Sequence, residues 1–246
     1  MPTPPPSIPL PELRRRFRER PASLLGRIPG VFLVDKPEGM TSHDVVAVAR
    51  RRLGLRRVGH GGTLDPMATG LLVVFAGNAT RLFDELQAFP KAYEAELRLG
   101  VTTETQDRTG AVVAERPVPP LADDAIETAL ERFRGAIQQT PPMYSALKKD
   151  GRPLYEYARE GKTVHREPRA VTVHALALTG RQGETLRLAM TVSKGFYVRT
   201  LVHDLGEALG CGATMTALRR TRIGPFDVAD AVAPDTLLPP PEAAND

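Results

Sequence analysis

The 246-residue sequence is poor in cysteine and in aromatic residues, and it has no long hydrophobic run. A single cysteine, Cys211, excludes an intramolecular disulfide and suits a reducing compartment. No apolar segment is long enough to cross a bilayer, and the N-terminus has no apolar signal segment, so we expect a cytoplasmic protein outside the membrane. Hydrophobic residues make up 41% and charged residues 25%, which is typical of a globular chain that can bury a sizeable core.

The charge that is present is dominated by arginine, and the formal net charge is +4. The arginines gather in three clusters, which are Arg14, Arg15, Arg16, Arg18 and Arg20; Arg50, Arg51, Arg52, Arg56 and Arg57; and Arg219, Arg220 and Arg222. Such clusters are typical either of solvated helix faces or of surfaces that bind a polyanion such as nucleic acid. Charge alone does not decide between these two interpretations.

The pattern along the chain predicts a Pro-rich basic extension at 1–28, a folded domain at 29–229 and a short Pro-rich tail at 230–246. We expect helices at 42–53, 122–135, 153–161 and 196–210, and strands at 31–35, 71–77, 91–100, 170–180 and 184–195. Thr41 and Asp44 form a capping box before the first helix, and Gly54 ends it. Because strands and helices do not alternate regularly, the sequence predicts an α+β fold.

Several short motifs for cofactors and nucleophiles are incomplete. A dinucleotide fingerprint would need glycine at Leu64, and a phosphate loop would need glycine at Glu156. Ser145 and Lys148 match the S-x-x-K pattern of acyl-transfer enzymes, but its companion motifs are missing, so a serine hydrolase is a distant alternative. The histidines and the cysteine lack zinc-ligand spacing. The sequence therefore predicts no cofactor and no metal.

The stretch "GHGGTLDPMATGLL" (59–72) concentrates four glycines around one carboxylate, Asp65. Taken alone, Asp65 followed by Pro66 favours an ordinary helix cap. The glycines, a nearby histidine and arginine-rich flanks favour a different role, since glycine permits unusual dihedrals and close backbone approach to a ligand. The alternative is that the turn presents Asp65 to a ligand.

Extended to "GHGGTLDPMATGLLVV", this stretch closely resembles the signature of the bacterial TruB family of tRNA pseudouridine synthases. Four further stretches resemble the family's other blocks in the same order: "VDKPEGMTSHDVV", "KAYEAELRLGVTTETQDRTG", "PPMYSALKKDGRPLYEYAREG" and "SKGFYVRTLVHDLGEALGCGATMTALRRTRIGPF". The resemblance covers about residues 30–228. It implies a pseudouridine synthase fold, with a mixed, mainly antiparallel sheet flanked by helices, and isomerisation of the T-loop uridine 55 of tRNA to pseudouridine.

The resemblance also implies three catalytic residues. The family's catalytic aspartate falls on Asp65, the tyrosine against the target base on Tyr93, and the basic partner of the aspartate on Arg199. The reaction breaks the C1′–N1 bond and rejoins the uracil through C5, so it needs neither redox cofactor nor metal. The carboxylate would act as a nucleophile at the sugar or the base, or would remove the 2′ proton. Tyr93 would remove the C5 proton or support that step.

A second set of residues is expected to bind the substrate: His60, Leu218, Tyr197, Gly61, Thr63 and Lys36. In the family the residue at His60 inserts into the T loop as the target base flips out, and the one at Leu218 packs against the uracil. Lys36 and Pro37 match a motif that supports the active-site loop. Taken singly, Leu218, Lys36 and Pro37 fit a structural role equally well.

The sequence departs from many family members at both ends. Few residues follow Phe226, so we expect no full C-terminal PUA domain, and a basic extension precedes the folded part. The expected partner is the T arm of tRNA, bound by a monomer, with the arginine clusters contacting phosphates. Two alternatives stay open: an RNA chaperone activity, and a related synthase acting on another RNA.

Overall fold

The computed structural model describes residues 30–237, and the chain folds into two compact units. Unit 1 combines the chain up to Ala92 with the chain from Arg219 onward, and unit 2 is Tyr93–Leu218. Strands β4 (Lys91–Leu99) and β12 (Ala213–Ile223) each run from one unit into the other. The expected extension at 1–28, with its arginine cluster, lies outside the described residues.

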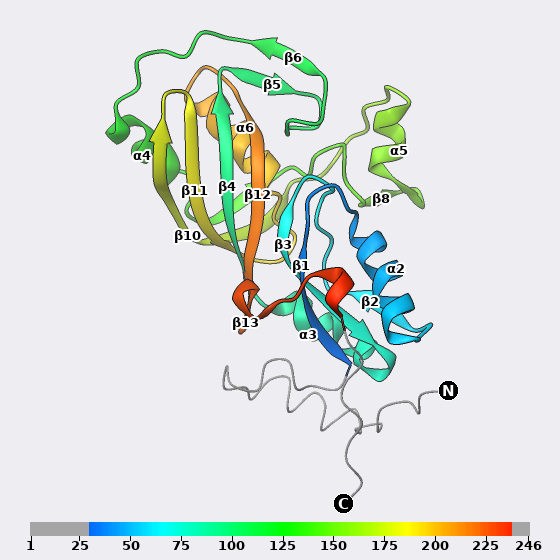
Figure 1. The fold of residues 1–246 in the computed structure, drawn as a ribbon. Helices are drawn as coiled ribbons and strands as arrows, with labels where there is room; N and C mark the ends of the chain where they lie inside the picture. The colour runs from blue at the N-terminus through cyan, green and yellow to red at the C-terminus, as the bar shows by residue number, and fades with distance from the viewer. Residues whose placement is uncertain (1–29, 238–246) are drawn as a thin grey trace, which may run out of the picture. The chain divides into compact units, whose positions relative to one another are not determined.

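Unit 1 is built on β3 (Thr69–Ala76), which pairs antiparallel with β1 (Val31–Lys36) and with β2 (Val58–His60). The end of β12 pairs with β3 in parallel, so this sheet is mixed, and β13 (Phe226–Asp227) pairs with β12 (Figure 1). The helical segments of this unit are α2 (Ser42–Leu53), η2 (Gly77–Leu82), α3 (Phe83–Ala88), η3 (Val228–Asp230) and η4 (Pro234–Thr236).

The apolar run in β3 explains how unit 1 buries its core. Alternate residues of a strand point to opposite faces. Leu71, Val73 and Phe75 enter a cluster with residues of η2 and α3, whereas Leu72 and Val74 enter a second cluster with α2. Because both faces of β3 are covered, the strand has no polar alternation and is buried from Gly70 to Ala76.

Helix α2 begins and ends where the sequence predicts. The Thr41 side chain accepts a hydrogen bond from the Asp44 N–H at 3.0 Å, and the Asp44 carboxylate accepts one from the Thr41 N–H at 2.8 Å. Gly54 ends the helix in the left-handed conformation, with φ 64°. The capping box and the glycine stop are confirmed.

Unit 2 contains the strand order β12–β4–β11–β10–β7, with β7 at Gly135–Gln139, β10 at Arg169–Gln182 and β11 at Thr185–Val192. Two small sheets pair β5 (Val101–Thr103) with β6 (Val112–Glu115) and β8 (Lys148–Lys149) with β9 (Arg152–Pro153). Its helices are α4 (Asp123–Glu131), α5 (Leu154–Arg159) and α6 (Val198–Ala208), and α6 lies behind β4 and β12 in Figure 1.

The α+β fold is confirmed, and two local expectations differ. The helix expected at 122–135 ends at Glu131, because the chain turns there and enters β7 at Gly135, which has a positive φ of 81° and pairs with β10. The tail expected from residue 230 contacts unit 1 at separate points as far as the structure describes it. Val232, itself 44% exposed, bonds β1 through its backbone, and Leu237, 2% exposed, covers apolar surface in the cluster with α2. The division of the chain at residues 28 and 229 stays a prediction.

Candidate active site

Asp65 lies in a turn between β2 and β3, and no helix follows it. The Asp65 carbonyl accepts a hydrogen bond from the Ala68 N–H at 3.0 Å, and β3 begins at Thr69. The helix-cap interpretation is therefore wrong. Aspartate at the first and proline at the second position are also preferred in a β-turn. The pair Asp65-Pro66 is therefore compatible both with a helix N-terminus and with a β-turn.

The backbone on each side of Asp65 is held by the first residue of α2 and by the segment that joins β1 to α2. The Ser42 hydroxyl accepts a hydrogen bond from the Leu64 N–H at 2.9 Å and donates one to the Leu64 carbonyl at 3.2 Å. On the other side, the Pro66 carbonyl accepts a hydrogen bond from the Gly39 N–H at 2.8 Å. These bonds fix the direction of the turn that carries the carboxylate.

Lys36 is fully buried and holds the same turn. Its ammonium donates to the carbonyls of Pro37 at 2.9 Å, Met40 at 2.7 Å and Pro66 at 3.2 Å. Burial lowers the pKa of the Lys36 ammonium, and the negative charge of Asp65 opposes that shift. Lys36 thus places a positive charge near Asp65 and joins two loops through their backbones.

Arg220 is a second buried cation beside the turn, and it was not among the predicted site residues. It is 2% exposed, and it donates from Nε to the Leu71 carbonyl at 2.7 Å and from Nη2 to the Gly62 carbonyl at 3.1 Å. Sequence reasoning grouped it with surface arginines, since nothing local distinguishes a buried arginine from its exposed neighbours.

The other arginines of that cluster are also engaged by internal partners. Arg219 makes two hydrogen bonds to the Asp35 carboxylate, at 3.1 and 2.8 Å, and Arg222 bonds Asp227 at 3.2 and 3.0 Å. Strand pairing brings carboxylates and carbonyls directly against these guanidinium groups. The expectation that this cluster contacts phosphate stays a prediction.

Three of the four glycines around Asp65 are required by the space or the dihedrals available. A Cβ on Gly61 would lie 1.9 Å from Leu86 Cδ2, and one on Gly70 would lie 2.3 Å from the Arg220 carbonyl oxygen. Gly62 has φ 112° and Gly70 has φ 99°, which disfavour a side chain. Gly59 has open space around it. The glycines therefore allow the turn to pack closely against α3 and β12.

His60 ends β2 and is partly buried, whereas Thr63 is exposed. The His60 ring meets the His43 ring edge to face, with centroids 5.3 Å apart and planes at 84°. Burial first, and then the charges of His43 and Arg220, lower the pKa of His60 to about 4. Its Nδ1 is buried and makes no hydrogen bond within the described structure. His60 is therefore neutral at neutral pH.

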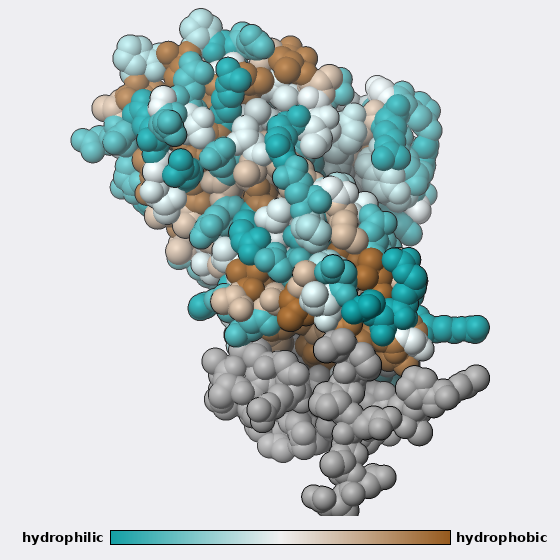
Figure 2. All heavy atoms as spheres, in the orientation of Figure 1, coloured by the Kyte–Doolittle hydropathy of each residue, from teal (hydrophilic) through white to brown (hydrophobic). Residues whose placement is uncertain are grey.

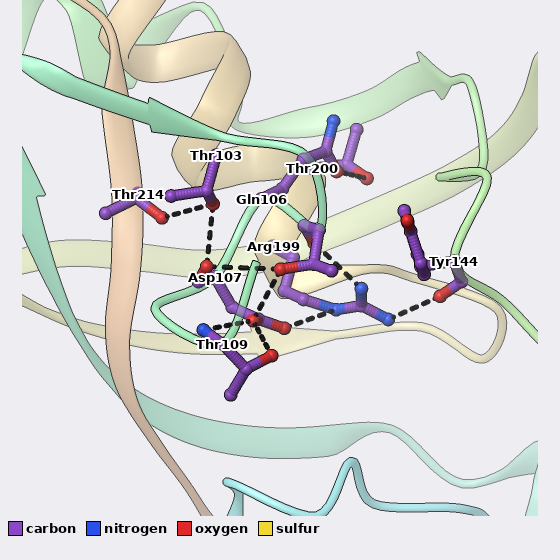
Figure 3. A network of polar contacts seen from close by, with 9 residues as sticks. Thr103, Gln106, Asp107, Thr109, Tyr144, Arg199, Thr200 and Thr214 are labelled. Carbon is purple, nitrogen blue, oxygen red and sulfur yellow. Dashed lines mark hydrogen bonds and ion pairs between the residues drawn. The ribbon is translucent and has the colours of Figure 1, made fainter. Parts of the chain in front are cut away.

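Arg199 lies in the first turn of α6 in unit 2 and is 5% exposed. Its Nη1 donates to the Thr105 carbonyl at 2.9 Å and its Nη2 to the Tyr144 carbonyl at 3.0 Å (Figure 3). Its Nε lies 3.8 Å from Oδ2 of Asp107. Two loops and a carboxylate therefore fix the guanidinium.

Asp107 is itself buried, and sequence reasoning did not identify it. Its Oδ1 accepts hydrogen bonds from the Thr105 hydroxyl at 2.7 Å, the Thr109 N–H at 2.9 Å and the Thr109 hydroxyl at 2.6 Å (Figure 3). An aspartate flanked at two residues on each side by threonine, with Gly110 following, is the signal that could have predicted this tight loop. The loop provides a preformed negative charge for Arg199.

The remaining predicted residues of unit 2 lie on β4, β12 and the start of α6. Tyr93 is partly buried on β4, and Leu218 is 8% exposed on β12. Tyr197 precedes α6, and its backbone is held by the Gln139 amide, which accepts from the Tyr197 N–H at 2.8 Å and donates to its carbonyl at 3.0 Å. Asp65 belongs to unit 1, so its pairing with Arg199 stays a prediction.

The remaining motifs gain no support. Ser145 is buried with no hydrogen-bond partner for its Oγ among the described residues, and Lys148 is exposed on β8.

Within residues 30–237, His, Cys, Asp and Glu side chains form no group of three or more that could hold a metal. In the same range no helix has the length and apolar character to span a membrane.

Comparison with known proteins identifies the class. Residues 50–198 match the profile described as TruB family pseudouridylate synthase (N terminal domain), and residues 199–239 match the tRNA pseudouridylate synthase B C-terminal domain. The chain belongs to the TruB family of pseudouridylate synthases, which are isomerases.

Three relatives are called tRNA pseudouridine synthase B. Those from Aromatoleum aromaticum, an Azoarcus species and Opitutus terrae are 55%, 52% and 49% identical over 83%, 89% and 87% of this chain, and the matches cover 66%, 73% and 89% of the relatives. The chain thus spans slightly under two thirds of the first relative's length.

Solved structures agree on the fold. A chain of a Cbf5–Nop10–Gar1 complex is 34% identical with a TM-score of 0.64, and the match covers 85% of this chain and 53% of that one. A chain of an archaeal box H/ACA sRNP Nop10–Cbf5 complex is 31% identical with a TM-score of 0.62, covering 88% and 54%. The chain spans about half the length of these two.

Proposed function

We propose that this protein is a tRNA pseudouridine synthase that isomerises uridine 55 in the T arm of tRNA, acting as a cytoplasmic monomer. The observation that carries the proposal is the turn at Asp65, whose backbone is anchored on both sides and is flanked by three glycines, Gly61, Gly62 and Gly70, at which the space or the dihedrals disfavour a side chain. A single carboxylate held in this way is what the reaction requires. The names of the relatives support tRNA as the substrate.

Asp65 is the proposed catalytic carboxylate. The reaction needs an ionised carboxylate beside the ribose, either as nucleophile or as the base that removes the 2′ proton. The Lys36 ammonium lies close enough to Asp65 for the two opposite charges to interact. Nucleophilic attack at the sugar or the base and removal of the 2′ proton all use the same carboxylate, close to the flipped nucleotide.

Arg199 and Tyr93 are proposed to complete the reaction. Arg199 is held in place within unit 2 by two carbonyls and by Asp107, and its proposed role is to direct the Asp65 carboxylate. Tyr93 would remove the C5 proton of the turned uracil or support its removal. Leu218 and Tyr197 would bound the pocket for the base.

His60 is proposed to occupy the space that the target base leaves. Extruding a base costs a few kcal/mol, which stacking and hydrogen bonds in the pocket offset. Insertion into stacked bases favours an uncharged ring, since a charged one would lose its hydration. The low pKa of His60, about 4, supplies that neutral ring.

The test is release of tritium from tRNA transcripts labelled at C5 of uridine 55 only, compared with transcripts labelled at every other uridine. Wild type is expected to release about one equivalent from the first and none from the second. Asp65→Asn should release none while still binding tRNA. Asp84→Asn, an exposed carboxylate on α3, is the control and should match wild type. Release by Asp65→Asn at the wild-type rate would refute the role of Asp65.

A further inference from the structure

The corner of unit 1 where α2 meets β2 carries five arginines within eight residues. All five are exposed: Arg50, Arg51, Arg52, Arg56 and Arg57. We call this set the α2–β2 corner. Figure 2 shows hydrophilic side chains projecting into solvent at the edge of unit 1 where Figure 1 places α2 and β2.

The fold itself turns these arginines outward. The buried face of α2 uses Val45, Val46, Ala49 and Leu53, so the three arginines of its last turn are left on the solvent side. Gly54 then ends the helix in a left-handed turn, and Leu55 packs against the core cluster. The chain passes through Arg56 and Arg57 directly into β2. Both groups of arginines therefore flank one tight turn.

No carboxylate within the described part of the chain neutralises the corner. Arg50 and Arg52 donate only to the carbonyls of Val58 at 3.1 Å and Leu237 at 3.3 Å. Elsewhere in the described structure ion pairs are common: Arg116 with Glu207, Arg134 with Glu127, Arg152 with Glu160, Arg181 with Asp123, Arg219 with Asp35, and Arg222 with Asp227.

The corner is therefore a concentration of charge that the fold leaves unpaired. Its five positive charges exceed the net charge of +4 of the whole chain, so the rest of the chain is close to neutral. The carbonyls at the end of α2 favour cations, but they supply only about half an elementary charge. Like charges this close repel one another unless an anion lies against them. Guanidinium groups suit phosphate oxygens best.

We propose that the α2–β2 corner binds the phosphate backbone of the RNA substrate, as a contact surface separate from the turn that carries Asp65. The inference rests on the proposed function for the identity of the RNA. It assigns phosphate binding to this arginine cluster, whereas Arg219, Arg220 and Arg222 serve internal contacts. Each arginine that neutralises a phosphate releases condensed counterions, so binding depends steeply on salt.

The experiment measures the dissociation constant of full-length protein and an unmodified tRNA transcript over a range of salt concentrations. The test variant is Arg56→Gln/Arg57→Gln, and Arg51→Gln is then added to it. None of these three side chains makes a hydrogen bond or ion pair within the described structure, so folding should be little affected. The control is Arg132→Gln/Arg169→Gln, which removes the same charge from exposed positions of unit 2.

The slope of log binding constant against log salt is expected to fall in magnitude by about one per arginine removed from the corner. At about 0.1 M salt, each removal should weaken binding roughly five- to tenfold. The control variant should keep the wild-type slope. Equal slopes for wild type, test and control would overturn the proposal and leave the corner as a solvated face. Pseudouridine formation by wild type, measured in parallel, tests the proposed function separately.

Discussion

Three cations, Lys36, Arg199 and Arg220, are buried and bind backbone carbonyls in the same manner. Each is at most 5% exposed and donates to backbone carbonyls of two loops or strands that are distant in sequence. A carbonyl bonded to a buried charge is held more firmly than one bonded to water. These residues therefore fix loops that carry candidate site residues through the backbone rather than through side-chain contacts.

His60 gives a prediction at the same scale. Its folded pKa, about 4, lies below the unfolded value of about 6.5, so the unfolded state binds more protons between these values. Stability is therefore full above pH 6.5 and is lost as pH falls toward 4. The free energy of unfolding should be about 2 kcal/mol lower at pH 5 than at pH 7 from this group alone.

Urea unfolding of wild type and His60→Gln at pH 7 and pH 5 measures that contribution. The quantity compared is the loss of unfolding free energy between the two pH values in each protein. The wild-type loss on going to pH 5 should exceed that of His60→Gln by about 2 kcal/mol. His174→Gln, at an exposed position of β10, should behave like wild type. If His60→Gln and wild type lose equal stability, the low pKa is refuted.

At the scale of elements, the close pairing of β3 with β12 requires glycine at position 70. Gly70 pairs with Arg220 in parallel and has φ 99°, and a Cβ there would meet the Arg220 backbone. Gly70→Ala should therefore lower the free energy of unfolding by about 3 kcal/mol or more, from strain and displaced pairing together.

The matched control is Gly59→Ala on β2, where a Cβ meets nothing within 4 Å and the φ is not positive. That change should alter stability by no more than about 0.5 kcal/mol. Chemical denaturation of both variants gives the comparison. Similar stabilities for the two variants would mean that the sheet next to Asp65 tolerates a side chain at Gly70.

Elements governed by local sequence could be predicted, whereas those governed by distant partners could not. Three features depend only on residues that are close in sequence, and all three are confirmed: the capping box at Thr41, the end of α2 at Gly54 and the apolar run of β3. The early end of α4 at Glu131 depends on β7 pairing with β10, which no local pattern reveals. Likewise, aspartate before proline is compatible with a cap or a turn, and pairing of β3 selects the turn.

For the molecule as a whole, the sequence predicts the family and the residues that match its motifs, but not their surroundings. Asp107 and Arg199 are far apart in sequence and meet only through the fold. The arginine clusters at 50–57 and 219–222 look alike in composition. The first is exposed and has no carboxylate partner among the described residues, whereas the second is engaged by the carboxylates of Asp35 and Asp227 and by buried carbonyls. Tertiary partners, rather than residue type, separate their roles.

The last prediction concerns Leu237, at the end of the described chain, which packs the segment after β13 against α2. Leu237 is 2% exposed in the cluster with α2, and its carbonyl accepts a hydrogen bond from Arg52. Leu237→Ala should therefore cost about 2–3 kcal/mol of unfolding free energy, as for other buried leucines. Val112→Ala, at a position 56% exposed on β6, is the control and should cost almost nothing. Denaturant unfolding distinguishes the two, and equal effects would mean that this segment is not part of the core and that α2 is stable without it.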